Sequence, residues 1–200
     1  MLKKGFLLLL TLLFILPTMA FGEEASTLEF KDVGMRLEVP SNYKSITLDT
    51  PKDDPIFEEI GSAYEDIKTD FELNYFYLYT FEKDLQNLIR VEAIPFSYDG
   101  LLFENMDLAE LQEKAKLIQE QSVVSGLISP VVEVYECDNA TYIHSTSVEN
   151  DAVATWDVDQ YIRLSKTHYI VITRLSMNKS FTETDNEIMK DFIDSIEYIN

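Results

Sequence analysis

The sequence predicts an α+β fold in which an antiparallel β-sheet carries helices packed on both faces, an α/β/α sandwich. Two observations lead to this prediction. Segments with apolar residues at every second position come in adjacent pairs joined by short polar turns, which is typical of antiparallel strands. Other segments carry apolar residues at helical spacing, so the order is hairpin, helices, hairpin, helix, β-meander, helix.

The first 22 residues have the pattern of a secretory signal peptide, because two lysines precede an apolar run from 6 to 16, followed by a proline and small residues. The run is about a dozen residues, whereas a bilayer-spanning helix needs roughly 20. A permanent membrane anchor is therefore the less favoured alternative. We expect cleavage between Gly22 and Glu23, with cleavage after Ala20 as the alternative.

Residues 23–200 are predicted to form a single domain that is secreted or otherwise extracytoplasmic. No cysteine lies near the cleavage site, so a lipid anchor is not expected, and neither is stable membrane association after the signal is removed. Cys137 is the one cysteine of the chain, so no intramolecular disulfide can form. The packed core must therefore supply the stability.

The predicted hairpin comes first, with strands at 27–30 and 35–40. Met35, Leu37 and Val39 alternate with polar residues, and the proline at position 40 ends the second strand.

A helix is predicted to begin after Asp54, whose side chain can cap the first turn, with Pro55 as the first residue. Its apolar positions recur at helical spacing. Gly61 interrupts the pattern, and Ser62 with Glu65 has the spacing of a capping box, so two short helices are the alternative to one.

The next strand, predicted over 75–81, is dense in aromatic residues. Strict alternation places one set of side chains on one face (Tyr75, Tyr77, Tyr79 and Phe81) and another on the other (Phe76, Leu78 and Thr80). Because both sets are largely apolar, we interpret the strand as covered on both sides, with a ligand-binding platform as the alternative. Its expected partner is the strand at 88–96.

The second half of the chain begins with a helix over 107–122, opened by a capping box of Asp107 and Glu110. Four strands follow, at 131–137, 140–148, 152–164 and 168–175, and the first two are joined by a two-residue turn. A last helix is predicted to be capped by Thr184 with Glu187.

At this point the chain resembles the PsbP-like fold, named for an extrinsic protein of photosystem II and shared by several exported bacterial proteins. The resemblance is carried by F-x-x-x-G-M-x-L-x-V-P at 30–40, YIRLSKTHYIVIT at 161–173 and FIDSIEYI at 192–199. It implies an antiparallel sheet with helices on both faces across nearly all of residues 23–200. Members of this fold mostly serve as accessory, assembly or binding proteins, and no residue here matches the manganese-related role of the photosystem member.

The charge of the chain argues against two classes of partner. It has 16 basic and 36 acidic residues, and without the two signal lysines the balance is 14 against 36, a net charge of -22. Nucleic acids and anionic membranes bind clustered lysine and arginine, and no such cluster follows the signal peptide. Acidic turns at 49–55, 149–153 and 182–187 lack the pattern of a calcium loop, so we interpret them as solvated turns, with calcium binding as the alternative.

Catalytic and cofactor motifs are not evident. The glycines are scattered, so no phosphate-binding loop is predicted, and we expect no cofactor and no metal site. The two histidines, His144 and His168, are interpreted as structural or solvent-facing. Cys137 lies between two acidic residues that disfavour its thiolate, which argues against a nucleophile.

Four arginines follow the signal peptide, and all fall in predicted strands. If residues 165–167 form a three-residue hairpin loop, Arg174 faces Val158, one step from Trp156, and the guanidinium can stack on the indole. One hypothesis is a binding surface for an anion formed by Arg163, Arg174 and Trp156. The other is that each arginine neutralises a neighbouring carboxylate.

The sequence therefore predicts an exported, non-enzymatic binding or accessory protein of the cell envelope or extracellular space, with a bacterial source indicated by its short signal peptide. Its partner is expected to be a protein or a small molecule. The alternative is a secreted hydrolase with an unrecognised active site.

Overall fold

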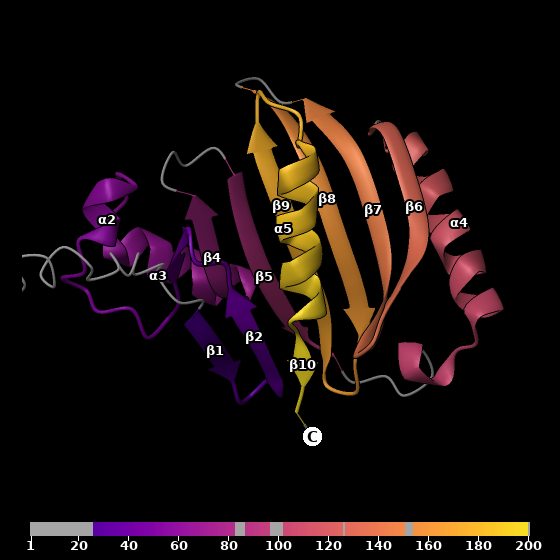
Figure 1. Cartoon of the computed structure of the whole chain (residues 1–200), viewed down its shortest axis with the longest axis horizontal. Coiled ribbons are helices and arrows are strands. Elements are labelled where there is room, and N and C mark those ends of the chain that lie inside the picture. Colours follow the sequence, from indigo (N-terminus) through magenta and orange to yellow (C-terminus); the bar gives the residue numbers. More distant parts are fainter. Residues whose placement is uncertain (1–25, 83–86, 97–101, 126, 151–153, 200) are drawn as a thin grey trace, which may run out of the picture.

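The computed structural model describes residues 26–82, 87–96, 102–125, 127–150 and 154–199 (Figure 1). The predicted signal peptide and its cleavage site at Gly22 and Glu23 lie outside the described residues. None of the helices that the structure describes combines the length and apolar composition that a bilayer span requires.

A seven-stranded antiparallel sheet forms the centre of the fold, with strand order β3-β4-β5-β9-β8-β7-β6. This confirms the predicted antiparallel sheet, including the pairing of β4 with β5 and the meander from β6 to β9. The strands are β3 (Tyr43–Ile46), β4 (Phe76–Glu82), β5 (Asn87–Pro95), β6 (Ile128–Cys137), β7 (Ala140–Asn150), β8 (Thr155–Leu164) and β9 (His168–Met177).

A second sheet of three strands joins the two ends of the described chain. The predicted hairpin forms β1 (Ser26–Phe30) and β2 (Met35–Val39), and the short β10 (Glu197–Tyr198) pairs with β2. The N–H of Ile199 donates to the carbonyl of Gly34 at 2.7 Å. Gly34 has a φ of 66°, in the left-handed region that glycine adopts without strain.

The helices are α2 (Ile56–Glu59), α3 (Tyr64–Asn74), α4 (Leu108–Val124) and α5 (Glu183–Asp194), and a 3₁₀ turn, η2, covers Phe103–Asn105. Of the two readings of the first helical segment, two short helices is therefore the correct one. Helix α2 begins at Ile56, one residue later than predicted, with Pro55 at the N-cap position; Oδ1 of Asp54 nevertheless accepts from the N–H of Ile56 at 2.9 Å. The capping box at the start of α4 is also confirmed.

Two of the predicted caps are wrong. Ala63, with no side-chain cap, precedes α3, so the capping box of Ser62 and Glu65 does not form. Helix α5 begins two residues earlier than predicted, where Thr182 and Asp185 form the box in place of Thr184 and Glu187. The sequence offers both spacings, and burial of Asp185, which is 7% exposed, favours the earlier start.

One face of the large sheet is covered by α5 and the small sheet. Figure 1 shows α5 lying over β8 and β9, with β1, β2 and β10 beside it. The buried side chains of α5 that fill this layer are Met189, Phe192 and Ile193, followed by Ile196. They pack with those of β2 against the central strands.

The opposite face carries α3 at one end and α4 at the other. Phe71 of α3 packs with Phe76 and Phe81 of β4. Leu111 of α4 packs with a group that includes Ile143 of β7. The next residue along β7, Tyr142, points to the other face and packs in the layer under α5. Helices thus lie on both faces of the sheet, as the predicted fold class requires.

The aromatic strand does not alternate as predicted. Tyr75 lies outside β4, at the C-terminal end of α3 with a φ of 56°, and is 48% exposed. The pairing with β5 shifts between Phe76 and Leu78, so Phe76 packs under α3 although Tyr77 and Leu78 pack in the layer under α5. The prediction of one shared face for four rings is therefore wrong, because a bulge was not visible in the sequence.

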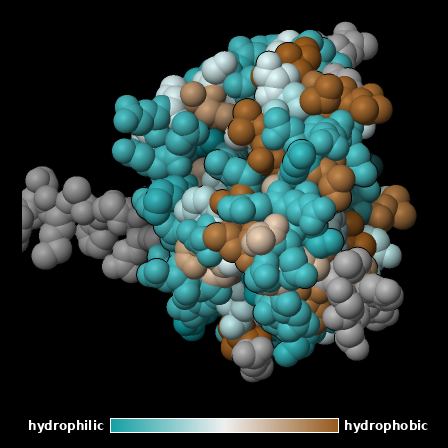
Figure 2. Space-filling model, turned by 90° about the vertical axis from the view of Figure 1, so that its right-hand side faces the viewer, coloured by the Kyte–Doolittle hydropathy of each residue, from teal (hydrophilic) through white to brown (hydrophobic). Residues whose placement is uncertain are grey.

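The edge of the sheet at β6 is exposed beside α4. Figure 2 looks onto this side, which is mainly hydrophilic with hydrophobic residues in separate small groups. The exposed apolar side chains of these two elements include Val123, Val124, Ile128 and Val131. Pro130 and the acidic Glu133 on the same strand disfavour pairing with a further strand.

Candidate functional site

The connection between β8 and β9 determines where Arg174 lies. Leu164 pairs with Tyr169, and Arg174 pairs with Asp159, so the register predicted from a three-residue loop is wrong by one residue. The physical reason is that Ser165 pairs with His168 across a tight turn: the N–H of Ser165 donates to the carbonyl of His168 at 2.9 Å, and its Oγ accepts from the N–H of His168 at 3.1 Å. A shift of one residue in the pairing at the turn changes every cross-strand neighbour.

Arg174 is buried, and both of its terminal nitrogens contact the protein, whereas its Nε, like that of Arg163, has no hydrogen-bond partner. Its Nη2 lies 2.6 Å from Oδ2 of Asp159 and 2.7 Å from Oδ1 of Asn186, and its Nη1 donates to the carbonyl of Asp185. The guanidinium lies 3.8 Å from the ring centroid of Phe181. The hypothesis that an arginine neutralises a neighbouring carboxylate therefore describes Arg174, and this side chain ties α5 to the sheet.

Trp156 does not join Arg174. It pairs with Met177, three positions along β8 from Asp159. Because side chains alternate along a strand, the indole projects to the face opposite Arg174. The predicted binding surface of Arg163, Arg174 and Trp156 is therefore not assembled as one unit.

His144 lies between two carboxylates in a cavity of about 340 Å³ that also contains Ser180. Its Nε2 is 2.7 Å from Oδ1 of Asp159, and its Nδ1 is 3.2 Å from Oε1 of Glu133. Burial acts to lower its pKa, but the hydrogen bonds and charges of Asp159 and then Glu133 together raise it. Both ring nitrogens of His144 thus face carboxylates, which favours the protonated imidazole over the neutral form that acts as a general base.

His168 lies apart from His144, at the start of β9. Its Nδ1 is 2.8 Å from Oγ1 of Thr167, and burial lowers its pKa although the charge of Asp32 acts the other way. Among the described residues, no three histidine, cysteine or carboxylate side chains are grouped so as to hold a metal ion. The acidic turn at 182–187 forms the start of α5, and part of the turn at 149–153 lies outside the described residues.

Arg163 differs from the other arginines. Arg36 pairs with Glu197, and Arg90 Nε lies 3.1 Å from Oε1 of Glu92. In the part of the chain that the structure describes, Arg163 has no carboxylate within ion-pair distance. Its Nη1 donates to the carbonyl of Thr141 at 3.1 Å, and its guanidinium lies 4.7 Å from the ring centroid of Tyr198.

The Tyr198 ring supplies no compensating negative charge. Burial raises the pKa of Tyr198 to about 12, while the hydrogen bond to Tyr142 and the charge of Arg163 act to lower it, so the phenol is neutral at physiological pH. The buried Nε of Arg163 has no hydrogen-bond partner. The positive charge of Arg163 is therefore left uncompensated by its immediate contacts.

Arg163 lines a cavity of about 300 Å³, which we call the Arg163 cavity, between the β1–β2 turn, the β8–β9 turn and the chain after β10. Its charged lining residues are three cations (Lys31, Arg163 and Lys166) and two carboxylates (Asp32 and Glu104). The described residues of the lining thus have a net charge of +1, in a chain whose net charge is -20. Gly34 also lines the cavity, and its lack of a side chain allows the carbonyl of Ile199 to approach the β1–β2 turn closely.

Neither carboxylate of the Arg163 cavity pairs with Arg163, although Glu104 pairs with Lys166, which lines the same cavity. Oδ2 of Asp32 accepts from the hydroxyl of Tyr77 at 2.8 Å, and Oε1 of Glu104 lies 3.5 Å from Nζ of Lys166. An anion in the cavity would therefore meet Arg163 without having to displace a carboxylate from it. The sequence indicated Arg163 but missed Lys31 and Lys166, because both lie in turns that only the fold brings together.

The end of α3 forms a groove of about 470 Å³ that includes part of the aromatic strand. Phe76 and Tyr79 line it with Arg90 and Glu92, and the Arg90 guanidinium lies 5.3 Å from the Phe76 ring centroid. Burial raises the pKa of Glu92, although the charge of Arg90 opposes this shift. Phe76 and Tyr79 thus border a groove at this end of the aromatic strand, but the charged groups beside them, Arg90 and Glu92, already pair with each other.

The arrangement of strands and helices defines a PsbP-like α+β sandwich, the fold that the sequence motifs indicated. The structure is similar to that of cyanobacterial PsbP (CyanoP) from Synechocystis sp. PCC 6803, with a TM-score of 0.50 and 10% identity over 90% of this chain and 95% of that chain. No family model matches the sequence. A search of curated proteins finds no relative by sequence.

Two further solved structures have lower similarity. LpqN of Mycobacterium tuberculosis, described as involved in cell envelope biogenesis, has a TM-score of 0.44 and 10% identity over 90% of this chain and 88% of that chain. A protein of Bacteroides thetaiotaomicron VPI-5482 has a TM-score of 0.46 and 8% identity over 84% of this chain and 46% of that chain. At such identities the likeness to solved structures concerns the fold alone.

Proposed function

We propose that the chain is an exported, non-enzymatic accessory protein that binds an anionic group, a carboxylate or a phosphate, in the Arg163 cavity. The anion belongs to a small molecule or to a protein partner in the cell envelope or extracellular space. The observation that carries the proposal is the uncompensated charge of Arg163 in a cavity whose lining is positive.

The chemistry of the cavity suits an anion better than another ligand class. Arginine presents planar, charge-assisted donors that match carboxylate and phosphate oxygens. Lys31 and Lys166 stand at exposed positions of the two turns, where flexible ammonium groups can approach the same ligand. The negative remainder of the surface repels large polyanions, so we expect a ligand with one or two charges.

Export is proposed on the pattern of residues 1–22, and an accessory role is supported by the fold, which commonly serves binding rather than catalysis. The contacts of His144 favour this proposal over a secreted hydrolase, because the histidine that shares a cavity with Ser180 is held between the carboxylates of Asp159 and Glu133.

The test is a titration of the purified chain from residue 23 with phosphate, with acetate and with a capped acidic peptide, followed by amide chemical shifts. We expect millimolar binding of at least one probe, with shifts confined to the β1–β2 and β8–β9 turns. Replacing Arg163 with Gln should weaken binding about tenfold or more, since a charge-assisted hydrogen bond contributes about 1.5–3 kcal/mol. Tighter binding of the peptide than of acetate would indicate a protein partner.

The matched control is Arg36→Gln, because Arg36 is also a strand arginine but pairs with Glu197 on an exposed part of β2. Binding should be unchanged in this variant. Lys166→Gln, at a position where the side chain is 72% exposed, reports on the cavity without a risk to folding and should weaken binding about threefold. Equal affinity of the wild type and Arg163→Gln would overturn the proposal.

A further inference from the structure

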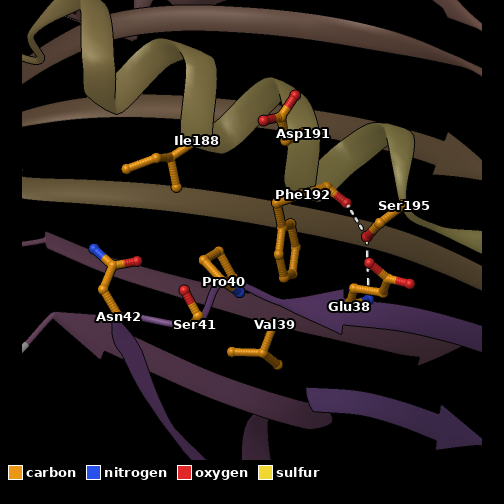
Figure 3. A pocket seen from close by; sticks show the side chains of 9 residues that line it. All are labelled: Glu38, Val39, Pro40, Ser41, Asn42, Ile188, Asp191, Phe192 and Ser195. Atoms are coloured by element: carbon orange, nitrogen blue, oxygen red, sulfur yellow. Dashed lines mark hydrogen bonds between the residues drawn. The ribbon is translucent and has the colours of Figure 1, made fainter. Parts of the chain in front are cut away.

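A separate pocket of about 300 Å³ lies between the end of β2, the turn into β3 and α5 (Figure 3). Its apolar surface is formed by Val39 and Pro40 on one side and by Ile188 and Phe192 on the other. Figure 3 shows Phe192 of α5 beside Pro40 and Val39, where the two walls of the pocket meet. We call it the β2–α5 pocket.

The two walls of the β2–α5 pocket are held together by hydrogen bonds. The N–H of Glu38 donates to Oγ of Ser195 at 3.1 Å, and this hydroxyl donates to the carbonyl of Phe192 at 2.7 Å. Val39 and Phe192 are each 1% exposed, so they are fixed by the core beneath them. The pocket therefore exists before any ligand enters, which lowers the entropic cost of binding.

Among the described residues, the charged ones that line the β2–α5 pocket are Glu38 and Asp191. Glu38 lies on one wall and Asp191 on the other, and both are exposed. Neither carboxylate is in an ion pair with any described basic group; nearby Lys190 pairs instead with Asp194. The net charge of -20 on the whole chain adds to the local attraction for a cation.

We propose that the β2–α5 pocket binds the side chain of a lysine or arginine presented by a partner polypeptide. Such a side chain has an apolar stem, which can lie along the partly exposed Pro40 and Ile188, and a cationic head that can reach Glu38 or Asp191. The volume suits one side chain, and an ordinary apolar side chain would leave both carboxylates without a partner. This site is distinct from the Arg163 cavity and does not depend on the function proposed for it.

The test uses three capped tripeptides, Gly-Lys-Gly, Gly-Arg-Gly and Gly-norleucine-Gly, with butylammonium as a free amine. Amide shifts of the chain from residue 23 follow each titration at low ionic strength. We expect millimolar binding of the lysine and arginine peptides, with shifts in 38–42 and 188–195, and at least tenfold weaker binding of the norleucine peptide. Butylammonium should bind more weakly than the lysine peptide, because it lacks the peptide groups.

Two exposed variants test the carboxylates directly. Glu38→Gln and Asp191→Asn should each weaken binding of the lysine peptide about threefold, and the matched control Glu187→Gln, on α5 but outside the pocket, should leave it unchanged. Equal binding of lysine and norleucine peptides, or full affinity in the double variant, would overturn the cationic assignment. If butylammonium binds as tightly as the peptide, the assignment to a polypeptide is wrong.

Discussion

Arg163 and Arg174 lie on the same face of the sheet but in opposite electrostatic surroundings. Arg174 on β9 faces Asp159 on the neighbouring strand β8, and this carboxylate neutralises its charge. Arg163 faces Ile170, and its guanidinium contacts the carbonyl of Thr141 and the neutral ring of Tyr198. The sequence shows only that both lie in strands. Which of them meets a carboxylate depends on the register, and one residue in the β8–β9 connection decides it.

The hydrogen bonds of His144 predict a pH dependence of stability. Its pKa is raised in the folded chain, against the effect of burial, by Asp159 and Glu133. A raised pKa means that the stabilisation is fully present below the unfolded value of about 6.5 and is lost as pH rises through the folded value. Denaturant unfolding between pH 5.5 and 8.5 should therefore show this contribution to the free energy of unfolding falling as pH increases.

The variant His144→Gln removes this contribution. At pH 5.5 it should lower the free energy of unfolding by about 1.5–3 kcal/mol, the range for hydrogen bonds to charged groups, and the difference from wild type should shrink toward pH 8.5. His168→Gln is the control, because the pKa of His168 is lowered by burial and its contribution is lost at low pH instead. A constant difference between wild type and His144→Gln across the range would refute this account.

At the scale of single elements, amphipathic patterns predicted the helices and the long strands, and local rules failed where two solutions were available. Two spacings at the start of α5 satisfied the capping rule, and the buried position of Asp185 decides between them. The bulge in β4 had no local signal, because it depends on the pairing with β5. The two-residue β10 is too short for any periodicity and forms only because β2 offers it an edge.

The close contact between the β1–β2 turn and the residue after β10 predicts that replacing Gly34 lowers the stability of the protein. A Cβ at Gly34 would lie 2.6 Å from the carbonyl oxygen of Ile199, so Gly34→Ala must displace the strand end as well as strain the backbone. We expect a loss of about 2–4 kcal/mol, measured by denaturant unfolding. Gly61→Ala is the matched control, since Gly61 has a φ of 68° but open space at the same position.

Gly61→Ala should cost only the backbone strain, about 1 kcal/mol. An equal loss in the free energy of unfolding of the two variants would show that the close approach of Ile199 adds nothing to the cost of replacing Gly34. A further readout is the amide exchange of Ile199, which should become faster in Gly34→Ala and stay unchanged in Gly61→Ala, because only the former disturbs its hydrogen bond to the turn.

At the scale of the whole molecule, the layer arrangement followed from the order of elements and from apolar faces that had to be covered. The candidate sites were harder to predict from the sequence. Lys31 is far in the chain from Arg163 and Lys166, and the three meet because β10 and the β8–β9 turn lie beside the β1–β2 turn. Their proximity depends on pairing between strands that are distant in the chain, which local sequence patterns do not reveal.

The predicted export gives a measurable prediction for the whole chain. Expressed with its full sequence in a secreting bacterium, the protein should be recovered outside the cytoplasm with Glu23 as its first residue, as determined by intact mass and N-terminal sequencing. A chain that begins at residue 21 would indicate the alternative cleavage site. Recovery of the uncleaved chain in membranes would show that the apolar run acts as an anchor.

The pairing of β10 with β2 places a time constraint on the chain. One edge of the small sheet is made by β10, which lies about 160 positions after the strand β2 that receives it. β5 likewise pairs with β9, which follows it by about eighty positions. Neither sheet can be completed until these distant segments meet, so we expect slower folding than for a chain of the same size whose contacts are mainly local.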